Sequence, residues 1–427
     1  MSDWTDRDAT VVWHGFTQMN TFKDNVPIIV DRAEGHYLLD VDGRRYLDAI
    51  SSLWVNTLGH RVAELDAALE EQLHKVAHST MLGHGNRVVV ELSEALAEVV
   101  PVTGPHFLYA SDGAAAVEQA LKLAFQYWVN LGENTRTTYL ALGDAYHGDT
   151  VGGVSLGGDG FGSDLFDPLR FPVVRTPGYD DPHALAKAAT TVAARASELA
   201  AVVVEPLVQG AAGIKVADPR EFARLQKACT ETDVLLICDE VATGFGRTGA
   251  LFASETCELR PDIMCLGKSL TGGYLPMAVT VANQRVYDAF LGKDLGPRTF
   301  YHGHSYGGNA LAAAVALRHL RLLEERQVLK NVQERSEQLH TLLEDRISKL
   351  DAVKEIRQRG LMAGIELHSG RDEKRGRRVC AAAVAKGVLL RPLGDVVVLM
   401  PPLSIASEEI ETIVDVLEDA IHEGVAR

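Results

Sequence analysis

The sequence lacks any apolar run of about 18 residues or more, the length that an α-helix needs to cross a bilayer. It also lacks a signal-peptide pattern, because MSDWTDRDATVVWHGF places acidic residues where such a peptide carries basic ones. Both absences argue against a secreted protein and against a membrane-spanning one. We therefore expect a cytoplasmic protein with no membrane partner.

Cysteine is scarce, and basic residues are outnumbered by acidic ones. The five cysteines form no CxxC pair, and Cys238 and Cys265 lie in apolar runs typical of buried thiols. We expect neither disulfides nor a metal site. The chain has 42 Lys and Arg against 58 Asp and Glu, a net charge of -16. This charge disfavours nucleic acid and anionic membranes as partners and leaves small molecules or proteins.

No internal repeat, low-complexity tract or linker rich in Pro, Gly and Ser interrupts the 427 residues. No GxGxxG follows an early strand with an acidic residue about 20 positions on, which argues against a dinucleotide-binding oxidoreductase. What is present is an ordinary globular composition, with 46% hydrophobic and 23% charged residues. This length predicts two or three domains with a sizeable core.

From about residue 100 onward, short β-branched runs alternate with longer segments of helical periodicity. This pattern is typical of an α/β protein whose mainly parallel sheet is covered by helices. The predicted strands are HFLYA, TTYLAL, AAVVVEP, VLLICDE, DIMCLG and MAVTVA. Ser111, Glu205 and Asp239 lie at the ends of three of them. Ligands of open parallel sheets bind beyond the carboxyl ends of strands, so these side chains are candidates for chemistry. Each of them alone has a plainer interpretation as a helix cap.

The two ends of the chain predict a smaller unit. Residues 310–351 are Ala-rich and then charged at i, i+4 spacing, which predicts a helix that links two domains. Short strands and a capped amphipathic helix follow it. Near the start, residues 27–50 alternate like a hairpin that turns at Asp42 and Gly43. We expect a large domain over residues 56–308 and a smaller α+β domain built from residues 1–55 and 309–427.

Three features of the predicted large domain fit one cofactor. A strand, a small-residue turn and a long helix let Gly113 and Ala114 present backbone N–H groups to a phosphate. Asp239 closes a buried strand, where a carboxylate stays ionised only beside a cation such as a protonated pyridine. Lys268 follows another buried strand, and burial lowers an amine pKa as an imine-forming nucleophile requires. Each alone could be a capped turn or a surface lysine; together they indicate pyridoxal 5'-phosphate (PLP).

Six ordered motifs extend this interpretation: YLDAISSLWVNTLGH, SDGAAAVEQALKLA, DAYHGDT, VVEPLVQGAAG, CDEVATGFGRTG and LGKSLTGGYLPMA. With them the chain resembles the class III aminotransferases of the fold type I, PLP-dependent family over nearly its whole length. The resemblance implies a large domain with a mainly parallel seven-stranded sheet and a smaller α+β domain. It also implies that Lys268 forms the Schiff base, Asp239 pairs with the pyridine nitrogen, Gly113 and Ala114 hold the phosphate, and Tyr146 stacks on the ring and assists catalysis.

The family is at least dimeric with shared active sites, so the resemblance also implies an obligate homodimer. In HGHSYGGN, Ser305 stands where the family usually has a threonine that reaches the phosphate across the dimer interface. Serine keeps the hydroxyl. The same resemblance assigns His304 to the cofactor site and Gly303 to the substrate site.

Within the class, four segments resemble a biotin-pathway group that converts 8-amino-7-oxononanoate to 7,8-diaminononanoate: WHGFTQM, AHSTMLGHGN, AFQYW and GVLLRPLGDVVVLMPPL. In that group the arginine matching Arg391 binds the far carboxylate of the oxononanoate, a role suited to a planar bidentate cation. Relatives that use ornithine or 4-aminobutyrate usually carry an arginine just before PPL, where this chain has Val398, Leu399 and Met400. The absence of that arginine argues against 2-oxoglutarate as the amino acceptor.

Two departures from that group leave the amino donor open. Phe16 stands where many members have a tyrosine, and Leu53 precedes Trp54 where they have two tryptophans. The usual donor, S-adenosylmethionine, carries an adenine and a sulfonium that aromatic walls favour. A subgroup takes lysine instead, and the Leu-Trp pair resembles it, although Trp54 alone could be a core residue. The alternative function is another class III ω-aminotransferase that takes a diamine, β-alanine or an aromatic amine with pyruvate.

Overall fold

The computed structural model describes residues 3–158, 163–369 and 374–426. Its largest sheet has seven strands in the order β4-β12-β11-β10-β7-β5-β6, and only β12 runs antiparallel to its neighbours. The predicted α/β class with a mainly parallel sheet is therefore confirmed. The strands are β4 (His106–Ala110), β5 (Thr138–Leu142), β6 (Val173–Thr176), β7 (Leu199–Val204), β10 (Leu235–Asp239), β11 (Ile263–Leu266) and β12 (Ala278–Ala282).

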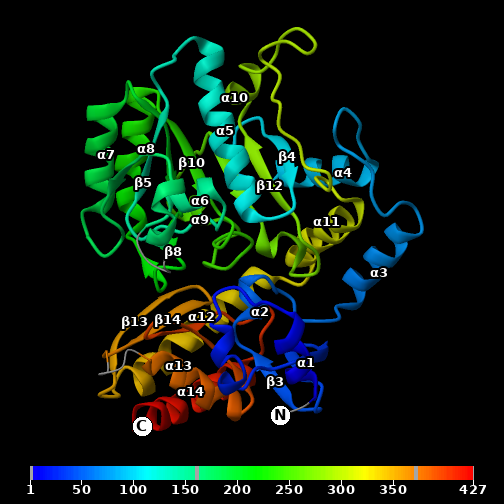
Figure 1. Ribbon diagram of the computed structural model, residues 1–427, viewed down its shortest axis with the longest axis vertical. Helices are drawn as coiled ribbons and strands as arrows, with labels where there is room; N and C mark the ends of the chain where they lie inside the picture. The colour runs from blue at the N-terminus through cyan, green and yellow to red at the C-terminus, as the bar shows by residue number, and fades with distance from the viewer. Residues whose placement is uncertain (1–2, 159–162, 370–373, 427) are drawn as a thin grey trace.

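Helices cover both faces of this sheet. Along β7, Val202 and Val204 belong to a core with α7 and α8, whereas Ala201 and Val203 belong to a core with α5. All four side chains are buried, so β7 is apolar throughout, as expected of a central parallel strand. Figure 1 shows these helices around the large sheet. The helices of this part are α3 (Ala63–Leu73), α4 (Arg87–Ala97), α5 (Gly113–Leu131), α6 (Val151–Leu156), α7 (Ala184–Arg195), α8 (Phe222–Thr232), α9 (Ala253–Thr256) and α10 (Gln284–Asp288).

Two four-stranded sheets lie below the large one in Figure 1, and one of them combines strands from both ends of the chain. In one, strand β15 (Val388–Leu389) pairs in parallel with β3 (Arg45–Asp48) of the N-terminal hairpin. That hairpin turns between Asp40 and Arg45, which confirms the predicted turn. The remaining strands are β1 (Val30–Glu34), β2 (Tyr37–Asp40), β13 (Val353–Arg359), β14 (Met362–Leu367), β16 (Arg391–Leu393) and β17 (Val396–Leu399). Helices α13 (Arg375–Ala385) and α14 (Ser407–Ala426) pack together beside them.

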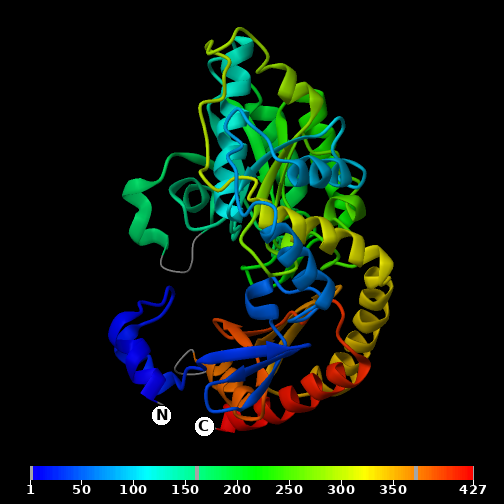
Figure 2. The same cartoon turned by 90° about the vertical axis from the view of Figure 1, so that its right-hand side faces the viewer.

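The segment that links the large sheet to the smaller ones is not one helix. It breaks between α11 (Ala310–Glu325) and α12 (Val328–Leu342), where Gln327 takes a left-handed conformation with φ 50°. The i, i+4 pattern continues on both sides of the break, so periodicity alone does not reveal it. Figure 2 shows both helices (yellow) running along one side of the molecule from the large sheet to the smaller ones.

The N-terminal segment stands away from the large sheet. Figure 2 shows α1 (Asp3–Val11) beside the smaller sheets, near one side of the molecule. Trp13, just after it, is 88% exposed, and Phe16 is 64% exposed. Among the residues that the structure describes, no helix has both the length and the apolar character needed to cross a membrane.

Candidate active site

A cavity of about 790 Å³ lies at the carboxyl ends of the central strands. Its walls come from the N-terminal segment, from the loops after β4, β5, β7, β10 and β11, and from β16. Of the twelve predicted site residues, nine line this cavity and three do not. The nine are Phe16, Leu53, Trp54, Gly113, Ala114, Tyr146, Asp239, Lys268 and Arg391.

One end of the cavity is the start of helix α5. Asp112 caps the helix, since its side chain accepts a hydrogen bond of 2.9 Å from the N–H of Ala115. The N–H groups of Gly113 and Ala114 have no acceptor within the described part of the chain. A Cβ added at Gly113 would stand 2.6 Å from Val241 Cγ1, so only glycine fits this turn. The turn therefore offers two free donors and a positive helix end to an anion.

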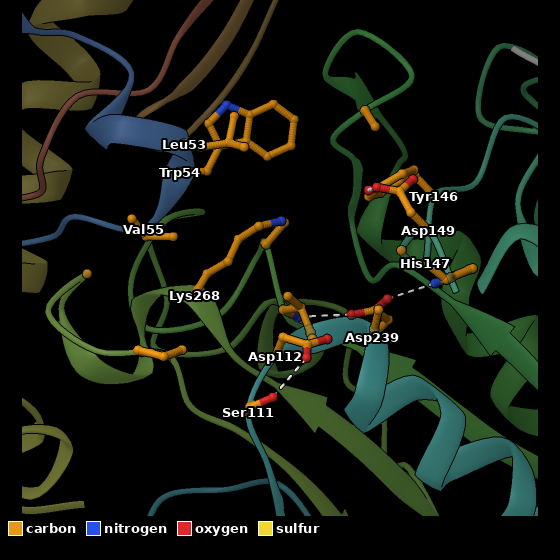
Figure 3. Close-up of a pocket in the computed structure, with 18 of the residues that line it drawn as sticks. Leu53, Trp54, Val55, Ser111, Asp112, Tyr146, His147, Asp149, Asp239 and Lys268 are labelled. Carbon is orange, nitrogen blue, oxygen red and sulfur yellow. Dashed lines mark hydrogen bonds and ion pairs between the residues drawn. The ribbon is translucent and has the colours of Figure 1, made fainter. Parts of the chain in front are cut away.

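Asp239 is hydrogen-bonded to His147, which was not among the predicted site residues. His147 Nδ1 donates to Asp239 Oδ2 at 2.7 Å, and the N–H of Val241 donates to Oδ1 at 3.0 Å (Figure 3). Burial alone would lower the pKa of His147, but the hydrogen bond and charge of Asp239 raise it. The signal in the sequence was slight, because His147 adjoins Tyr146 without any metal-ligand spacing. Asp239 is thus oriented into the cavity by fixed donors.

Lys268 begins a short 3-10 turn, Lys268–Thr271, with a strained φ of 43°. Its side chain extends between Trp54 on one side and Tyr146 and Asp239 on the other (Figure 3). The Lys268 Nζ atom lies 5.1 Å from the centroid of the Trp54 ring. Burial lowers the pKa of Lys268, and the negative charge of Asp239 only partly opposes it. A larger share of this amine is therefore neutral than in a surface lysine.

Tyr146 and Glu205 also line the cavity. The Tyr146 hydroxyl donates to Asp149 Oδ2 at 3.0 Å, and burial raises the pKa of the phenol, so it stays protonated. Glu205 follows β7 and accepts hydrogen bonds of 3.1 Å from the N–H groups of Tyr146 and Gly210. Burial raises the pKa of Glu205 to about 7. Glu205 was predicted to lie at a strand end as a candidate for chemistry, without a specific role.

The wall that carries Leu53 and Trp54 is prearranged by a buried carboxylate. Both oxygens of Asp48 accept hydrogen bonds from the N–H of Ser52, at 2.9 and 2.8 Å. This bond fixes a strained segment, since Ser52 and Trp54 have φ angles of 61° and 65°. Trp54 is 6% exposed and Leu53 is 47% exposed. The ring of Trp54 therefore forms a fixed surface, whereas Leu53 is open to solvent.

Arg391 lies on β16 and is half-buried at the cavity wall. Among the described residues, no carboxylate lies within ion-pair distance of its guanidinium. The cavity thus has the amine of Lys268 and an uncommitted cation in its lining. Such a pair suits a substrate that carries a reacting group and a separate carboxylate.

Gly303, His304 and Ser305 do not line the cavity of the single chain. His304 Nε2 lies 2.8 Å from the hydroxyl of Ser111, which does line it. Ser305 is exposed, and its carbonyl oxygen accepts from His78 Nε2 at 2.7 Å. The roles assigned to these three residues stay predictions.

Neither thiol nor metal chemistry is indicated by the described residues. All five cysteines, which lie within the described ranges, are buried free thiols. Within those same ranges, no group of three or more His, Cys, Asp or Glu side chains is placed to hold a metal ion. The polar groups that line the cavity include those of Lys268, Asp239, His147, Glu205 and Arg391.

Known proteins are similar to this chain in sequence and in fold. Residues 18–421 match the family described as aminotransferase class-III. The adenosylmethionine-8-amino-7-oxononanoate aminotransferase of Nitratidesulfovibrio vulgaris is 46% identical, over 97% of this chain and 80% of that protein. The crystal structure of the enzyme of that name from Methanocaldococcus jannaschii superposes with a TM-score of 0.94 at 38% identity, covering 98% of both chains. A PLP-bound amine transaminase from an uncultivated Pseudomonas species gives 0.90 at 32% identity, over 96% of this chain and 98% of that one. The chain is a class III aminotransferase.

Proposed function

We propose that this aminotransferase binds PLP and converts 8-amino-7-oxononanoate to 7,8-diaminononanoate. The observation that carries the proposal is Arg391, whose guanidinium lines the same cavity as Lys268 and has no acidic partner among the described residues. An oxononanoate carries its ketone near one end and its carboxylate at the other. Relatives at 38–46% identity bear the name of this reaction, which supports the choice of substrate.

The residues of the cavity fit PLP. The free N–H groups of Gly113 and Ala114 would hold the phosphate, and Asp239 would accept a hydrogen bond from the protonated ring nitrogen. Tyr146 would cover one face of the ring. When bound, PLP supplies an aldehyde that condenses with amines and a ring that accepts the electron pair left by a departing proton. Metal assistance has no part in the proposal.

The protein side of the mechanism follows from these positions. The neutral amine of Lys268 accepts the proton from the α-carbon of the donor and delivers a proton in the opposite sense when the oxononanoate is bound. His147 holds Asp239 in one orientation, so the ring-nitrogen proton is retained throughout. Arg391 binds the carboxylate and brings the ketone carbon to the Lys268 amine. Trp54 shields that amine from solvent.

Two donors fit the donor side of the cavity, S-adenosylmethionine and lysine. Trp54 offers an aromatic face, and Leu53 beside it is half-exposed and smaller than the second tryptophan expected for the sulfonium donor. Phe16, also in the lining, supplies a further ring but no hydroxyl. The proposal includes either donor.

The proposed working unit is a cytoplasmic homodimer. Apolar side chains lie exposed on the single chain, including Trp13, Tyr301 and Tyr306, which are 88%, 65% and 63% exposed. Tyr306 adjoins Ser305, the residue proposed to reach the partner's phosphate. A second copy that packs over Tyr301 and Tyr306 would bury these two rings and complete both cofactor sites.

Acceptor competition tests the proposed function. Holoenzyme charged with amine would be offered 8-amino-7-oxononanoate and pyruvate, and the two products would be quantified by mass spectrometry. We expect kcat/KM for the oxononanoate to exceed that for pyruvate by at least about 100-fold, because only the oxononanoate carboxylate reaches Arg391. A preference for pyruvate would favour the ω-aminotransferase alternative, which the likeness to the amine transaminase keeps open.

A further inference from the structure

Glu205 stands at the centre of the sheet, in the lining of the active-site cavity. It directly follows β7, which lies between β5 and β10, and it is 6% exposed. The mechanism proposed above uses Lys268, Asp239 and Arg391 and leaves Glu205 without a task. A buried carboxylate is costly to keep, so its presence in the lining calls for a reason.

The hydrogen bonds of Glu205 are incomplete. Each carboxylate oxygen accepts one backbone N–H, from Tyr146 and from Gly210, and no cation of the described residues pairs with it. A carboxylate has about four acceptor positions, so roughly two are left. Burial raises the pKa of Glu205 to about 7, and the charge of the nearby His147 opposes this rise only in part.

A neighbouring glutamate shows what a structural role looks like here. Glu240 is fully buried but does not line the cavity. Its two oxygens accept four hydrogen bonds, from Thr243 Oγ1, from Ser254 Oγ and from the N–H groups of Ala253 and Ser254. Glu240 is thus satisfied by the protein, whereas Glu205 keeps free acceptor positions beside the cavity.

The other acids of the lining have partners. Asp239 is engaged by His147 and Val241, Asp149 accepts the Tyr146 hydroxyl, and Asp112 caps α5. Among the acids of the described lining, Glu205 is the one whose hydrogen bonds come only from backbone N–H groups, so no side chain of the described residues engages it. It is also close enough to Lys268 for its charge to oppose the fall in the pKa of that amine.

The proposed substrate brings a matching group. In 8-amino-7-oxononanoate the amine sits on the carbon next to the ketone, and the product has amines on both carbons. When the ketone carbon reaches Lys268, the neighbouring ammonium must lie at that same end of the cavity, while the carboxylate extends to Arg391. An ammonium there needs a carboxylate acceptor.

We propose that Glu205 binds the ammonium group that is not exchanged, and so makes the enzyme select an α-amino ketone over a plain ketone. This assignment rests on the proposed function and deepens it. Glu205 then binds the ammonium at one end of the substrate, and Arg391 binds the carboxylate at the other end. The same contact would hold the vicinal diamine when the reaction runs in reverse.

Two ketones separate this role from a general one. Wild-type holoenzyme, Glu205→Gln and Glu205→Asp would each be given 8-amino-7-oxononanoate and 7-oxononanoate, which lacks the amine. We expect Glu205→Gln to lower kcat/KM for the amino ketone by about 10–100-fold and to change that for 7-oxononanoate by less than about 3-fold. Dissociation constants from calorimetry should show the same selective loss. Glu205→Asp keeps the charge and should recover part of the selectivity.

Asp149→Asn is the matched control, because Asp149 also lines the cavity and is near Tyr146. It should affect both ketones alike. Equal losses on both ketones in Glu205→Gln would overturn the assignment, and so would a selective loss in Asp149→Asn. A wild-type enzyme that aminates 7-oxononanoate but not 8-amino-7-oxononanoate would instead contradict the proposed function, and the role of Glu205 with it.

Discussion

The chemistry of Lys268 depends on how little water reaches its amine. The Trp54 ring lies 5.1 Å from Nζ, and burial lowers the pKa of the amine while Asp239 and Glu205 oppose that change. Charge and solvation thus balance so that the amine can both form an imine and carry a proton. Arg391 carries no such reactivity, and the task proposed for it is substrate binding.

Replacing Arg391 should therefore change binding more than chemistry. We expect Arg391→Ala to raise KM for 8-amino-7-oxononanoate by about 10–100-fold with little change in kcat, because a charge-assisted hydrogen bond is lost. Arg391→Lys should recover only part of the lost affinity for 8-amino-7-oxononanoate, since lysine cannot bind a carboxylate through two parallel hydrogen bonds. Steady-state kinetics with the acid and its methyl ester measures this. On the ester, wild type and Arg391→Ala should converge; a variant equally impaired on both would exclude the proposed contact. Arg87→Ala, at an exposed arginine, is the control.

At the scale of elements, an ion cluster ties the hairpin near the cavity to the smaller sheet. The hairpin comprises β8 (Val208–Gln209) and β9 (Lys215–Val216). Arg357 of β13 donates through Nε to the carbonyl of Gly213 at 3.1 Å, and its guanidinium pairs with Glu366 of β14 at 2.5 Å. Burial opposes the shift, but Lys354 and Arg357 lower the pKa of Glu366 to about 2. Glu366 thus stabilises this junction in its ionised form.

Glu366→Gln should destabilise the protein in a pH-dependent way. The folded-state pKa lies below the ordinary value of 4.5, so the stabilisation is present above about pH 4.5 and is lost as the pH falls toward about 2. We expect a loss of about 1–3 kcal/mol in the free energy of unfolding near pH 7, shrinking steadily below pH 4.5. Urea denaturation across this range measures it. A loss that does not vary with pH would mean that the ion pairs are unimportant. Glu231→Gln, in an exposed pair with Lys227, should cost less than about 0.5 kcal/mol.

The elements that the sequence predicted best are those with an unambiguous apolar pattern. Six of the seven strands of the large sheet were predicted, because runs such as LLIC are too apolar for a surface segment. The seventh, β6, is four residues long and has prolines close to both of its ends, so it lacks a strand signature. The break at Gln327 was missed because it interrupts no periodicity. Strand β6 and the break at Gln327 both depend on local backbone geometry, which tertiary packing determines.

The site was predicted where motifs carry chemistry and missed where contacts are long-range. Lys268 and Asp239 follow buried strands, which the sequence displays directly. The support of Asp239 by His147 joins residues 92 positions apart, and no spacing rule connects them. The Asp48 bond to Ser52 is local, but the segment that it fixes matters only because Trp54 lies beside Lys268, and that contact is long-range.

For the whole molecule, the central question is whether two chains share a cofactor site, as proposed. The loop that carries His304 and Ser305 is tied to its own chain through Ser111 and His78, yet Ser305 is exposed. This placement is what a residue acting on a partner requires. The domain boundaries at residues 55 and 308 stay predictions, as does the dimer.

Mixed dimers would test whether Ser305 of one chain acts in the active site of the other. A dimer of one Lys268→Ala chain and one Ser305→Asp chain, isolated with two different affinity tags, has one site with both residues intact if Ser305 acts across the interface. We expect it to recover about half of wild-type activity, although each homodimer is nearly inactive, because one of two sites is restored. The control is a dimer in which one chain carries both substitutions, Lys268→Ala and Ser305→Asp, and the other chain is wild type. No recovery in the mixed dimer would place Ser305 in its own chain's site, or in neither.

The most direct test of the whole account is a single-turnover absorbance measurement on purified holoenzyme. S-adenosylmethionine and L-lysine would be mixed with it separately, and 8-amino-7-oxononanoate would then be added. We predict that one of these donors bleaches the yellow band, that the oxononanoate restores it within one turnover, and that Lys268→Ala does neither. If neither donor bleaches the band, or if the oxononanoate leaves it bleached, the assigned reaction is contradicted and only the aminotransferase family remains.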